Sequence, residues 1–268
     1  MELNCQNCNE IITGYFCSNC GQKKYKRIDR KYVLDEVQYT FLHTNKGFLY
    51  SVKNIIKNPG KTARDFIDGN RVNHYKPILL AFVLSGISAF ISFKIIGLDK
   101  IMSSVYAKES INSEFMNDYM TVNTSYNSII MLLLIPFFAL FTKLAFRKWG
   151  HNYYEHVVMN SYILCFYTLF NIFLVYPLMF VFKSNMVEYF SYLINLSMLA
   201  VPFILVWFFK EFYSDKPLKS VIGRVGITVA LMALGFVILM MIIMVGAIIF
   251  AAIKGPEALE YLKPKQMR

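Results

Sequence analysis

Five long apolar runs follow one another in this chain, and they limit its possible folds more than any other feature. They lie at residues 77–98, 128–146, 160–182, 189–209 and 227–253. Each run is close to the ~20 residues that a helix needs to cross the hydrocarbon core of a bilayer. Because a spanning segment must satisfy its backbone hydrogen bonds internally, helices are the expected form. The sequence therefore predicts an all-α integral membrane protein built as a five-span helical bundle.

Composition and charge agree with this class. Hydrophobic residues make up 56% of the 268 residues, and the mean hydropathy is +0.42, which is too apolar for an ordinary soluble domain. A formal net charge of +11 would suggest nucleic acid as the partner of a soluble protein. Here the basic residues gather beside the apolar runs, as they do on the cytoplasmic side of membrane proteins. We therefore expect membrane lipids, and no nucleic acid, as partners.

Four of the five cysteines fall within the first twenty residues, in two Cys-x-x-Cys knuckles. Cys5-Gln-Asn-Cys8 and Cys17-Ser-Asn-Cys20 are eight residues apart. Two facing knuckles supply the four thiolates of a closed tetrahedral Zn²⁺ site. A site closed by four cysteines has no open coordination position, so we expect structural rather than catalytic zinc. Residues 1–24 are thus predicted to form a small zinc ribbon that depends on the metal for its stability.

The surroundings of the knuckles add two expectations. Ile11-Ile12 and Tyr15-Phe16 flank Gly14, an arrangement that favours a short hairpin between these two pairs. The first residues lack the basic and then apolar segments of a signal peptide, so the zinc ribbon is expected to stay in the cytoplasm. Thiols are reduced there, which favours metal binding over disulfides.

Residues 25–76 are predicted to be a basic linker followed by interfacial amphipathic helices. The clearest helical pattern is formed by Phe48, Leu49, Val52, Ile55 and Ile56, which share one face opposite basic residues. Such a helix lies on the inner leaflet or packs beneath the bundle. The basic polar face favours the membrane surface.

The segment between this helix and the first span contains turn and cap signals. Pro59-Gly60 is a turn signal, and Thr62 with Asp65 has the form of a capping box that opens a short helix. Gly69 is placed to close that helix.

Five basic side chains surround this short helix: Lys61, Arg64, Arg71, His74 and Lys76. Two interpretations remain open for this basic cluster. It anchors and orients the protein at anionic lipid headgroups, or it binds the phosphate of a lipid or a nucleotide.

Basic residues in the connections predict the topology. Lys143, Arg147 and Lys148 follow the second run, and Lys210, Lys216, Lys219 and Arg224 follow the fourth. Both connections and the N-terminal part should be cytoplasmic. An odd number of spans then puts the C-terminal tail, residues 254–268, on the outer side.

Few polar side chains interrupt the predicted spans. No Asp or Glu lies within them, and Asn171 and Asn195 are the strongly polar residues well inside. Ion-coupled transporters usually need ionisable groups in the membrane, so this pattern disfavours them but leaves open a neutral substrate or a lipid. Three prolines lie within the predicted spans: Pro136, Pro177 and Pro202. They either kink the helices around a cavity or introduce kinks that spanning helices tolerate without a functional role.

No catalytic set of residues is recognisable. His151 and His156 are five positions apart, about 140° around a helix, so they would not share a face, and an interfacial, non-catalytic role is expected. No Ser/His/Asp set, Walker loop or dinucleotide fingerprint appears. We therefore expect the protein not to be an enzyme.

Several motifs stand together in the first 77 residues. They are Cys17-Ser-Asn-Cys20-Gly21-Gln22, Gly47-Phe48-Leu49-Tyr50, the stretch 58–71, and His74-Tyr-Lys-Pro77. With them the chain resembles an uncharacterised bacterial family, common in Bacteroidota, that joins a zinc ribbon to a multi-span domain of unknown function. The resemblance implies a bacterial inner membrane and carries no activity. In span number and in the basic segment before the first span, the chain is also similar to five-span Yip-type trafficking proteins.

Two functions follow from these observations. The first is a non-enzymatic adaptor or regulatory membrane protein, whose cytoplasmic zinc ribbon docks a protein partner. The second is a transporter or lipid-handling protein, in which the basic cluster meets anionic headgroups at a cytoplasmic mouth.

Overall fold

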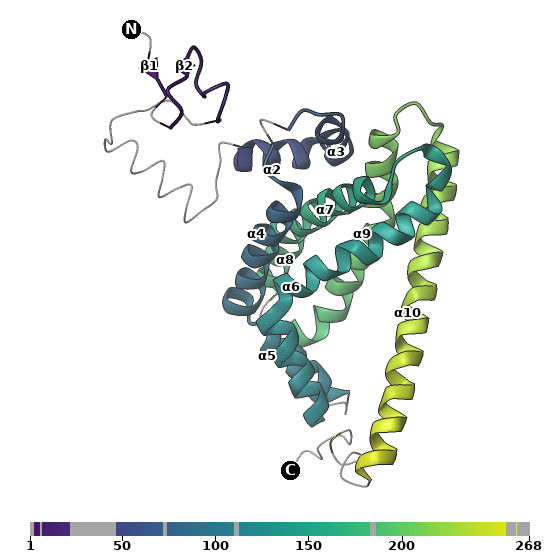
Figure 1. Ribbon diagram of the computed structural model, residues 1–268. Helices are drawn as coiled ribbons and strands as arrows, with labels where there is room; N and C mark the ends of the chain where they lie inside the picture. The colour runs from purple at the N-terminus through teal and green to yellow at the C-terminus, as the bar shows by residue number, and fades with distance from the viewer. Residues whose placement is uncertain are drawn as a thin grey trace. The chain divides into compact units, whose positions relative to one another are not determined.

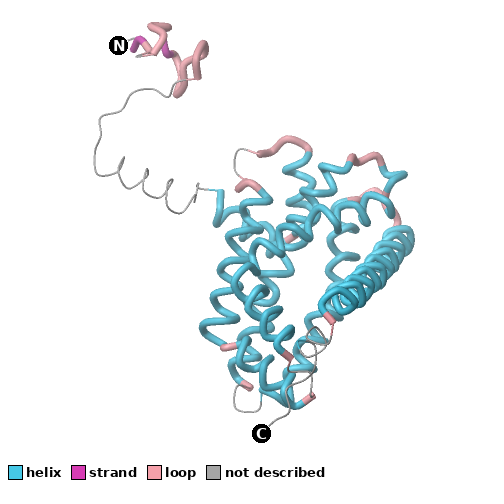
Figure 2. Tube along the Cα trace, turned by 60° about the horizontal axis from the view of Figure 1, so that its bottom comes forward, coloured by secondary structure: helices cyan, strands magenta, loops and turns pink. Residues whose placement is uncertain are grey.

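The computed structural model describes residues 3–5, 7–21, 47–71, 74–109, 113–182, 186–255 and 261. Two compact units divide the chain, Met1–Asn45 and Lys46–Arg268. Figures 1 and 2 show that helices dominate the second unit, while the strands of the described residues belong to the first. The predicted linker at 25–46 and most of the predicted tail at 254–268 lie outside the described residues.

The first unit, which we call the head, is a two-stranded hairpin with a cysteine-lined core. Strands β1 (Leu3–Asn4) and β2 (Ile11–Ile12) pair antiparallel, with Leu3 opposite Ile12. The hairpin therefore joins β2 to the preceding residues, because the turn of the first knuckle brings residues 3–4 back alongside β2. Phe16 forms an isolated β-bridge, and the expected hairpin around Gly14 stays a prediction.

Two short helices precede the first span. Helix α2 (Gly47–Lys57) buries Ile55 completely in the core of the second unit, while Leu49 stays 76% exposed. One face of the predicted amphipathic helix thus packs on the bundle. The backbone N–H of Tyr75 donates to Ser51 Oγ at 2.8 Å and fixes this packing.

Helix α3 (Pro59–Ile67) begins earlier than the sequence suggested. Asn58 is its N-cap, since Asn58 Oδ1 accepts from the Lys61 backbone N–H at 2.9 Å, and Pro59 occupies the first turn. The predicted turn at Pro59-Gly60 and capping box at Thr62 are therefore wrong. Thr62 lies inside the helix, where its hydroxyl donates to the Asn58 carbonyl at 2.7 Å.

Five helices of the second unit are long and apolar enough to cross a membrane, which confirms the predicted architecture. They are Pro77–Ile96, Glu114–Ala145, Tyr153–Val181, Glu188–Phe212 and Leu218–Phe250. Their constituent elements are α4 (Pro77–Ala89) with η1 (Phe90–Ile96), α6 (Glu114–Ala145), α7 (Tyr153–Phe170) with η3 (Asn171–Val175) and α8 (Tyr176–Val181), α9 (Met186–Phe212) and α10 (Leu218–Lys254). Helix α5 (Leu98–Lys108) and the 3-10 turn η2 (Arg147–Trp149) lie in connections.

Several helices extend beyond the predicted runs, because hydropathy marks a bilayer crossing and not the start of a helix. Helix α6 starts at Glu114, where Ser113 Oγ caps the Met116 N–H at 3.2 Å. Helix α7 starts at Tyr153, after a complete capping box formed by Asn152 and Glu155. Polar residues that hydropathy leaves out are thus part of both helices.

One end of the second unit is closed by an aromatic cluster. The Phe146 ring stacks on Phe209 with centroids 4.2 Å apart and on Tyr213 at 5.6 Å. Trp149, from the turn after α6, meets the Tyr213 ring edge-on at 4.6 Å. The connections after α6 and α9 therefore meet at the end of the bundle where α3 is docked, as Figure 1 shows.

Helix α10 attaches to the bundle through its first half. Val221, Val225 and Thr228 are buried, and Arg224 donates to the Ala145 carbonyl while its guanidinium lies 4.8 Å from the Trp149 ring centroid. From Leu234 onward its large apolar side chains are exposed, as expected for a helix that faces lipid.

Gly60 provides a test of α3 docking. A Cβ at this position would lie 2.2 Å from the Phe208 carbonyl oxygen and 2.8 Å from the Phe212 nitrogen, both backbone atoms that cannot rotate away. We expect Gly60→Ala to destabilise the purified protein by roughly 1–3 kcal/mol, measured as a lower midpoint of thermal unfolding. Gly223→Ala is the control, because nothing lies within 4 Å of its added Cβ. Equal midpoints of thermal unfolding for the two variants would contradict the close approach of the α3 backbone to the α9 backbone.

Candidate functional site

The four head cysteines lie close enough to bind a metal ion. The Sγ atoms of Cys5 and Cys20 are 3.5 Å apart, those of Cys8 and Cys17 are 3.5 Å apart, and those of Cys8 and Cys20 are 3.4 Å apart. All four ligand atoms fall within 4.8 Å of one another. A tetrahedral ion with metal–sulfur bonds of ~2.3 Å would hold its sulfurs about 3.8 Å apart. The geometry fits such an ion with little adjustment.

The two knuckles have the same backbone form. The Asn9 N–H donates to the Cys5 carbonyl at 2.9 Å, and the Gly21 N–H donates to the Cys17 carbonyl at 3.0 Å. Asn9 and Gly21 both have positive φ, 59° and 72°, which glycine and asparagine adopt most readily. Each knuckle thus ends in a left-handed residue that turns both thiols to one side.

Neighbouring thiols raise the pKa of Cys8 in the absence of a cation. The backbone hydrogen bond at Glu10 lowers the pKa of Cys8, but the thiol of Cys20, partial burial and the thiols of Cys17 and Cys5 together outweigh it and raise this pKa to about 12. Metal ligation requires thiolates, so a bound cation would reverse this balance. Among the described residues, these four cysteines are the group of three or more His, Cys, Asp or Glu side chains that lie close enough together to hold a metal ion.

The basic cluster is divided between exposed and internally bound residues. Lys61 and Lys76 are exposed. Arg64 instead donates to Ser214 Oγ at 2.8 Å and lies over the Phe212 ring, 5.7 Å from its centroid. Arg71 donates from Nε to the Phe66 carbonyl at 3.2 Å. The two arginines thus hold α3 in place as well as carrying positive charge.

His74, the fifth residue of the basic cluster, is buried. It is 8% exposed, with the Tyr50 ring at 5.1 Å and the Phe66 ring at 6.2 Å. Burial lowers the pKa of His74, and nearby Asp65 offsets this only in part. His74 therefore adds no positive charge at neutral pH, and it packs as an aromatic side chain.

His151, in the connection before the third span, and His156, inside that span, have separate partners. His151 Nδ1 lies 3.1 Å from the Tyr213 hydroxyl, in the connection before α7. His156 is fully buried in α7, with Nδ1 3.2 Å from Thr142 Oγ1 on α6. Their hydrogen bonds tie segments together.

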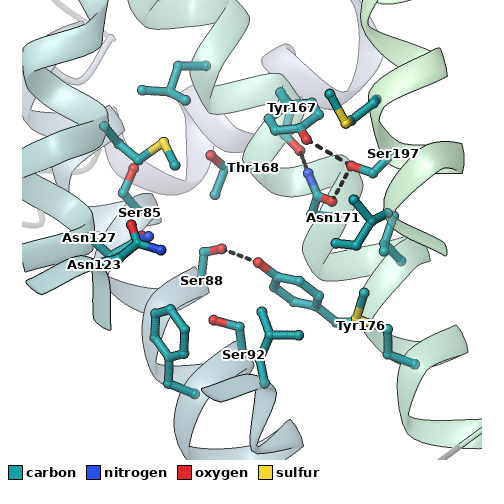
Figure 3. Close-up of a pocket in the computed structure, with 18 of the residues that line it drawn as sticks. Ser85, Ser88, Ser92, Asn123, Asn127, Tyr167, Thr168, Asn171, Tyr176 and Ser197 are labelled. Atoms are coloured by element: carbon teal, nitrogen blue, oxygen red, sulfur yellow. Dashed lines mark hydrogen bonds between the residues drawn. The ribbon is translucent and has the colours of Figure 1, made fainter. Parts of the chain in front are cut away.

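The second unit contains a cavity of about 200 Å³ between its spans (Figure 3). Side chains from α4, η1, α5, α6, α7, η3, α8 and α9 line it. Ten of the labelled lining residues carry a hydroxyl or amide: Ser85, Ser88, Ser92, Asn123, Asn127, Tyr167, Thr168, Asn171, Tyr176 and Ser197. None of the five residues of the basic cluster lines this cavity.

One wall of the cavity is a closed hydrogen-bond network. Ser197 Oγ donates to Asn171 Oδ1 at 2.8 Å and lies 2.8 Å from the Tyr167 hydroxyl. Asn171 Nδ2 donates to the Tyr167 carbonyl at 2.8 Å. These contacts join α7, η3 and α9 and hold the side chains in fixed positions.

Sequence reasoning identified Asn171 and missed the rest of the cavity. Asn195, the other polar residue noted in the spans, is exposed. The available signal was spacing: Ser85, Ser88 and Ser92 recur at three and four residues, which places them on one helical face. Small hydroxyls were not recognised because they barely lower the hydropathy of an apolar run.

The three prolines do not line the cavity, although one of them lies close to a backbone distortion at its border. Tyr126 interrupts α6 with non-helical φ and ψ of −115° and 17°, and two π-helical segments, η1 and η3, border the cavity. Pro177 lies two residues beyond the end of η3, so the carbonyl four residues before it belongs to η3. A proline ring clashes with the carbonyl four residues earlier, and local widening of the helix relieves this.

Comparison with known proteins links the α2–α4 region to one family. Residues 45–89 match the family model described as a protein of unknown function, DUF3667. The match takes in α2, α3 and α4, and therefore the docked segment and the first cavity helix. Searches of curated proteins and of solved structures found no match.

We expect the purified full-length protein to carry one metal ion per chain. Native mass spectrometry should show this added mass, and Cys17→Ser with Cys20→Ser should remove it, because two of four thiolates are lost. Cys165→Ala is the matched control: Cys165 is a buried thiol in α7, outside the cysteine set, and its replacement should leave the metal bound. Metal that persists in the double variant would contradict the assignment.

Proposed function

We propose that this chain is a non-enzymatic membrane protein whose zinc-bearing head docks a protein partner on the cytoplasmic side of a bacterial inner membrane. The observation that carries the proposal is a group of exposed apolar side chains on the head. Tyr15 is 81% exposed, Phe16 59% and Ile11 46%. A unit this small has little other surface, so an exposed aromatic pair is costly unless a partner covers it.

Chemistry supports a recognition role for these side chains. Aromatic residues are enriched in protein interfaces, and a few of them commonly supply most of the binding free energy. Ile12, Cys5 and Cys17 form the small core beneath. Because β2 and the second knuckle hold the exposed side chains, the metal would fix their positions before binding.

Zn²⁺ is the ion that this donor set suits best. Four thiolates in a tetrahedral arrangement are typical of structural zinc, and no position remains open for water or substrate. The ion would supply the folding free energy that a core of three buried residues cannot. The head would then serve recognition and not catalysis.

The proposed orientation follows from where the basic residues meet. The connections after α6 and α9 come together beside α3. The first carries exposed Arg147 and Lys148, and exposed Lys219 lies in the first turn of α10, after the second. Two further exposed ammonium groups belong to Lys61, in α3, and to Lys76, directly before α4. Anionic headgroups of the inner leaflet would attract this end of the bundle.

A second candidate, a transporter or other ligand-handling protein, is favoured by the polar cavity. Hydroxyl and amide groups that line a cavity inside a membrane bundle can pair with the polar groups of a ligand. The cavity lies apart from the basic cluster, so the cluster would anchor the protein and would not form the mouth of this cavity.

Replacing the exposed aromatics tests the docking function. We expect Tyr15→Ser with Phe16→Ser to reduce recovery of the partner about tenfold or more in crosslinking and pull-down from native membranes, with unchanged metal content. Tyr154→Ser is the control, because Tyr154 is 78% exposed but belongs to α7. Unchanged recovery with the double variant would rule out docking through this surface.

Reporter fusions test the orientation. Fusions after Gly150 and Asp215, and at the N-terminus, should report the cytoplasm, and a fusion after Glu109 should report the periplasm. An external head, or a cytoplasmic signal after Glu109, would overturn the proposed topology.

A further inference from the structure

Four polar side chains line the wall of the cavity opposite its closed network. They are Ser85 on α4, Asn123 and Asn127 on α6, and Thr168 on α7; Figure 3 shows the first three together on one side and Thr168 between them and the network. Ser85 is 2% exposed and its Oγ has no hydrogen-bond partner. Among the described residues, no contact satisfies the amides of Asn123 and Asn127 or the hydroxyl of Thr168.

Free hydroxyls in these helices need an explanation, because a simple alternative exists. Serine and threonine in a helix can donate to the carbonyl four residues earlier. Ser161, Thr142 and Thr228 do so, with distances of 2.8, 3.1 and 3.0 Å. Ser85 leaves this bond unmade, although an unpaired buried hydroxyl costs free energy. A ligand that pairs with Ser85 Oγ would remove that cost.

The backbone is distorted at three places around the same cavity. The π-helical segments η1 and η3 contribute Ser92 and Asn171, and the interruption of α6 at Tyr126 directly precedes Asn127. Short π-helical segments occur frequently at functional sites, where they re-aim side chains. Pro177 accounts for η3, but no proline lies within four residues after η1 or after Tyr126, so these two distortions at the cavity have no such cause.

The lining chemistry selects an uncharged ligand. Among the described lining residues there is no Asp, Glu, Lys, Arg or His to balance an ionic charge. Desolvating an ion between apolar spans without a counter-charge is unfavourable. Serine, threonine and asparagine groups both donate and accept, which matches ligand hydroxyls that do the same.

The volume of the cavity limits the size of the ligand. The volume of about 200 Å³ is below the ~300–1,000 Å³ typical of sites for drug-sized ligands. We propose that the cavity is a binding site for a small uncharged polyhydroxy compound, held by Ser85, Asn127 and Thr168 against the fixed network of Tyr167, Asn171 and Ser197. This site is independent of partner docking by the head, and it gives the ligand-handling candidate a substrate class.

Saturation-transfer NMR on the full-length protein in lipid nanodiscs tests the proposal. The probes are glycerol, erythritol and ribitol, with glycerate as the charged counterpart. At least one neutral polyol should give a saturable signal with an affinity at least tenfold above that for glycerate. Absence of saturable binding by all three polyols, or equal binding of glycerate, would overturn the assignment.

Two variants test whether a bound polyol contacts the cavity wall that carries Asn127 and Thr168. Thr168→Val keeps the shape of the side chain but removes the hydroxyl, so polyol affinity should fall about tenfold while the unfolding midpoint without ligand is unchanged or higher. Asn127→Leu should also weaken binding. Asn195→Leu is the control: it changes an exposed site outside the cavity and should leave the polyol affinity unchanged. Equal polyol affinity in Thr168→Val and in the unmodified protein would refute recognition by this wall.

Discussion

The absence of water in the bilayer core governs the second unit, because every polar group there must find its partner within the protein. Most do so locally. Thr142 shows the usual solution: it donates to carbonyls of its own helix and also accepts from Asn160 Nδ2 at 2.8 Å. The hydroxyl of Ser85 has no partner, as is also true of the Tyr162 hydroxyl and of His156 Nε2, and of these three residues Ser85 lines the cavity.

A different constraint governs the head. Its core consists of Cys5, Ile12 and Cys17, which cannot supply the free energy that ordering the chain requires. A metal ion on four thiolates would remove this deficit and would let the head expose aromatic side chains that a larger domain would bury. In the proposed function, stability and recognition are thus separated in the head: the sulfur atoms hold the fold, and the exposed aromatic side chains are available to a partner.

Within the second unit, α3 fixes one end of the bundle. Asn58 caps the helix with its side-chain Oδ1 and donates through Nδ2 to Glu211 at 2.7 Å, so one side chain both starts α3 and attaches it to α9. Gly60 permits the backbones to touch, and Arg64 extends the contact to Ser214. The match to a family of unknown function covers this segment, which agrees with its structural role.

The sequence predicted the features that depend on neighbouring residues in the chain. It did not predict which residues far apart in the chain pack together. The five spans followed from run length, and the metal-binding set followed from the spacing of Cys5, Cys8, Cys17 and Cys20, because both depend on neighbours in the chain. The cap at Asn58 was missed because two plausible cap signals lie four residues apart, and packing against α9 decides between them. The burial of His74 and the cavity lined by Ser85, Asn127 and Thr168 depend on which helix faces meet. Helix faces meet through contacts between residues far apart in sequence, and only the tertiary structure specifies those contacts.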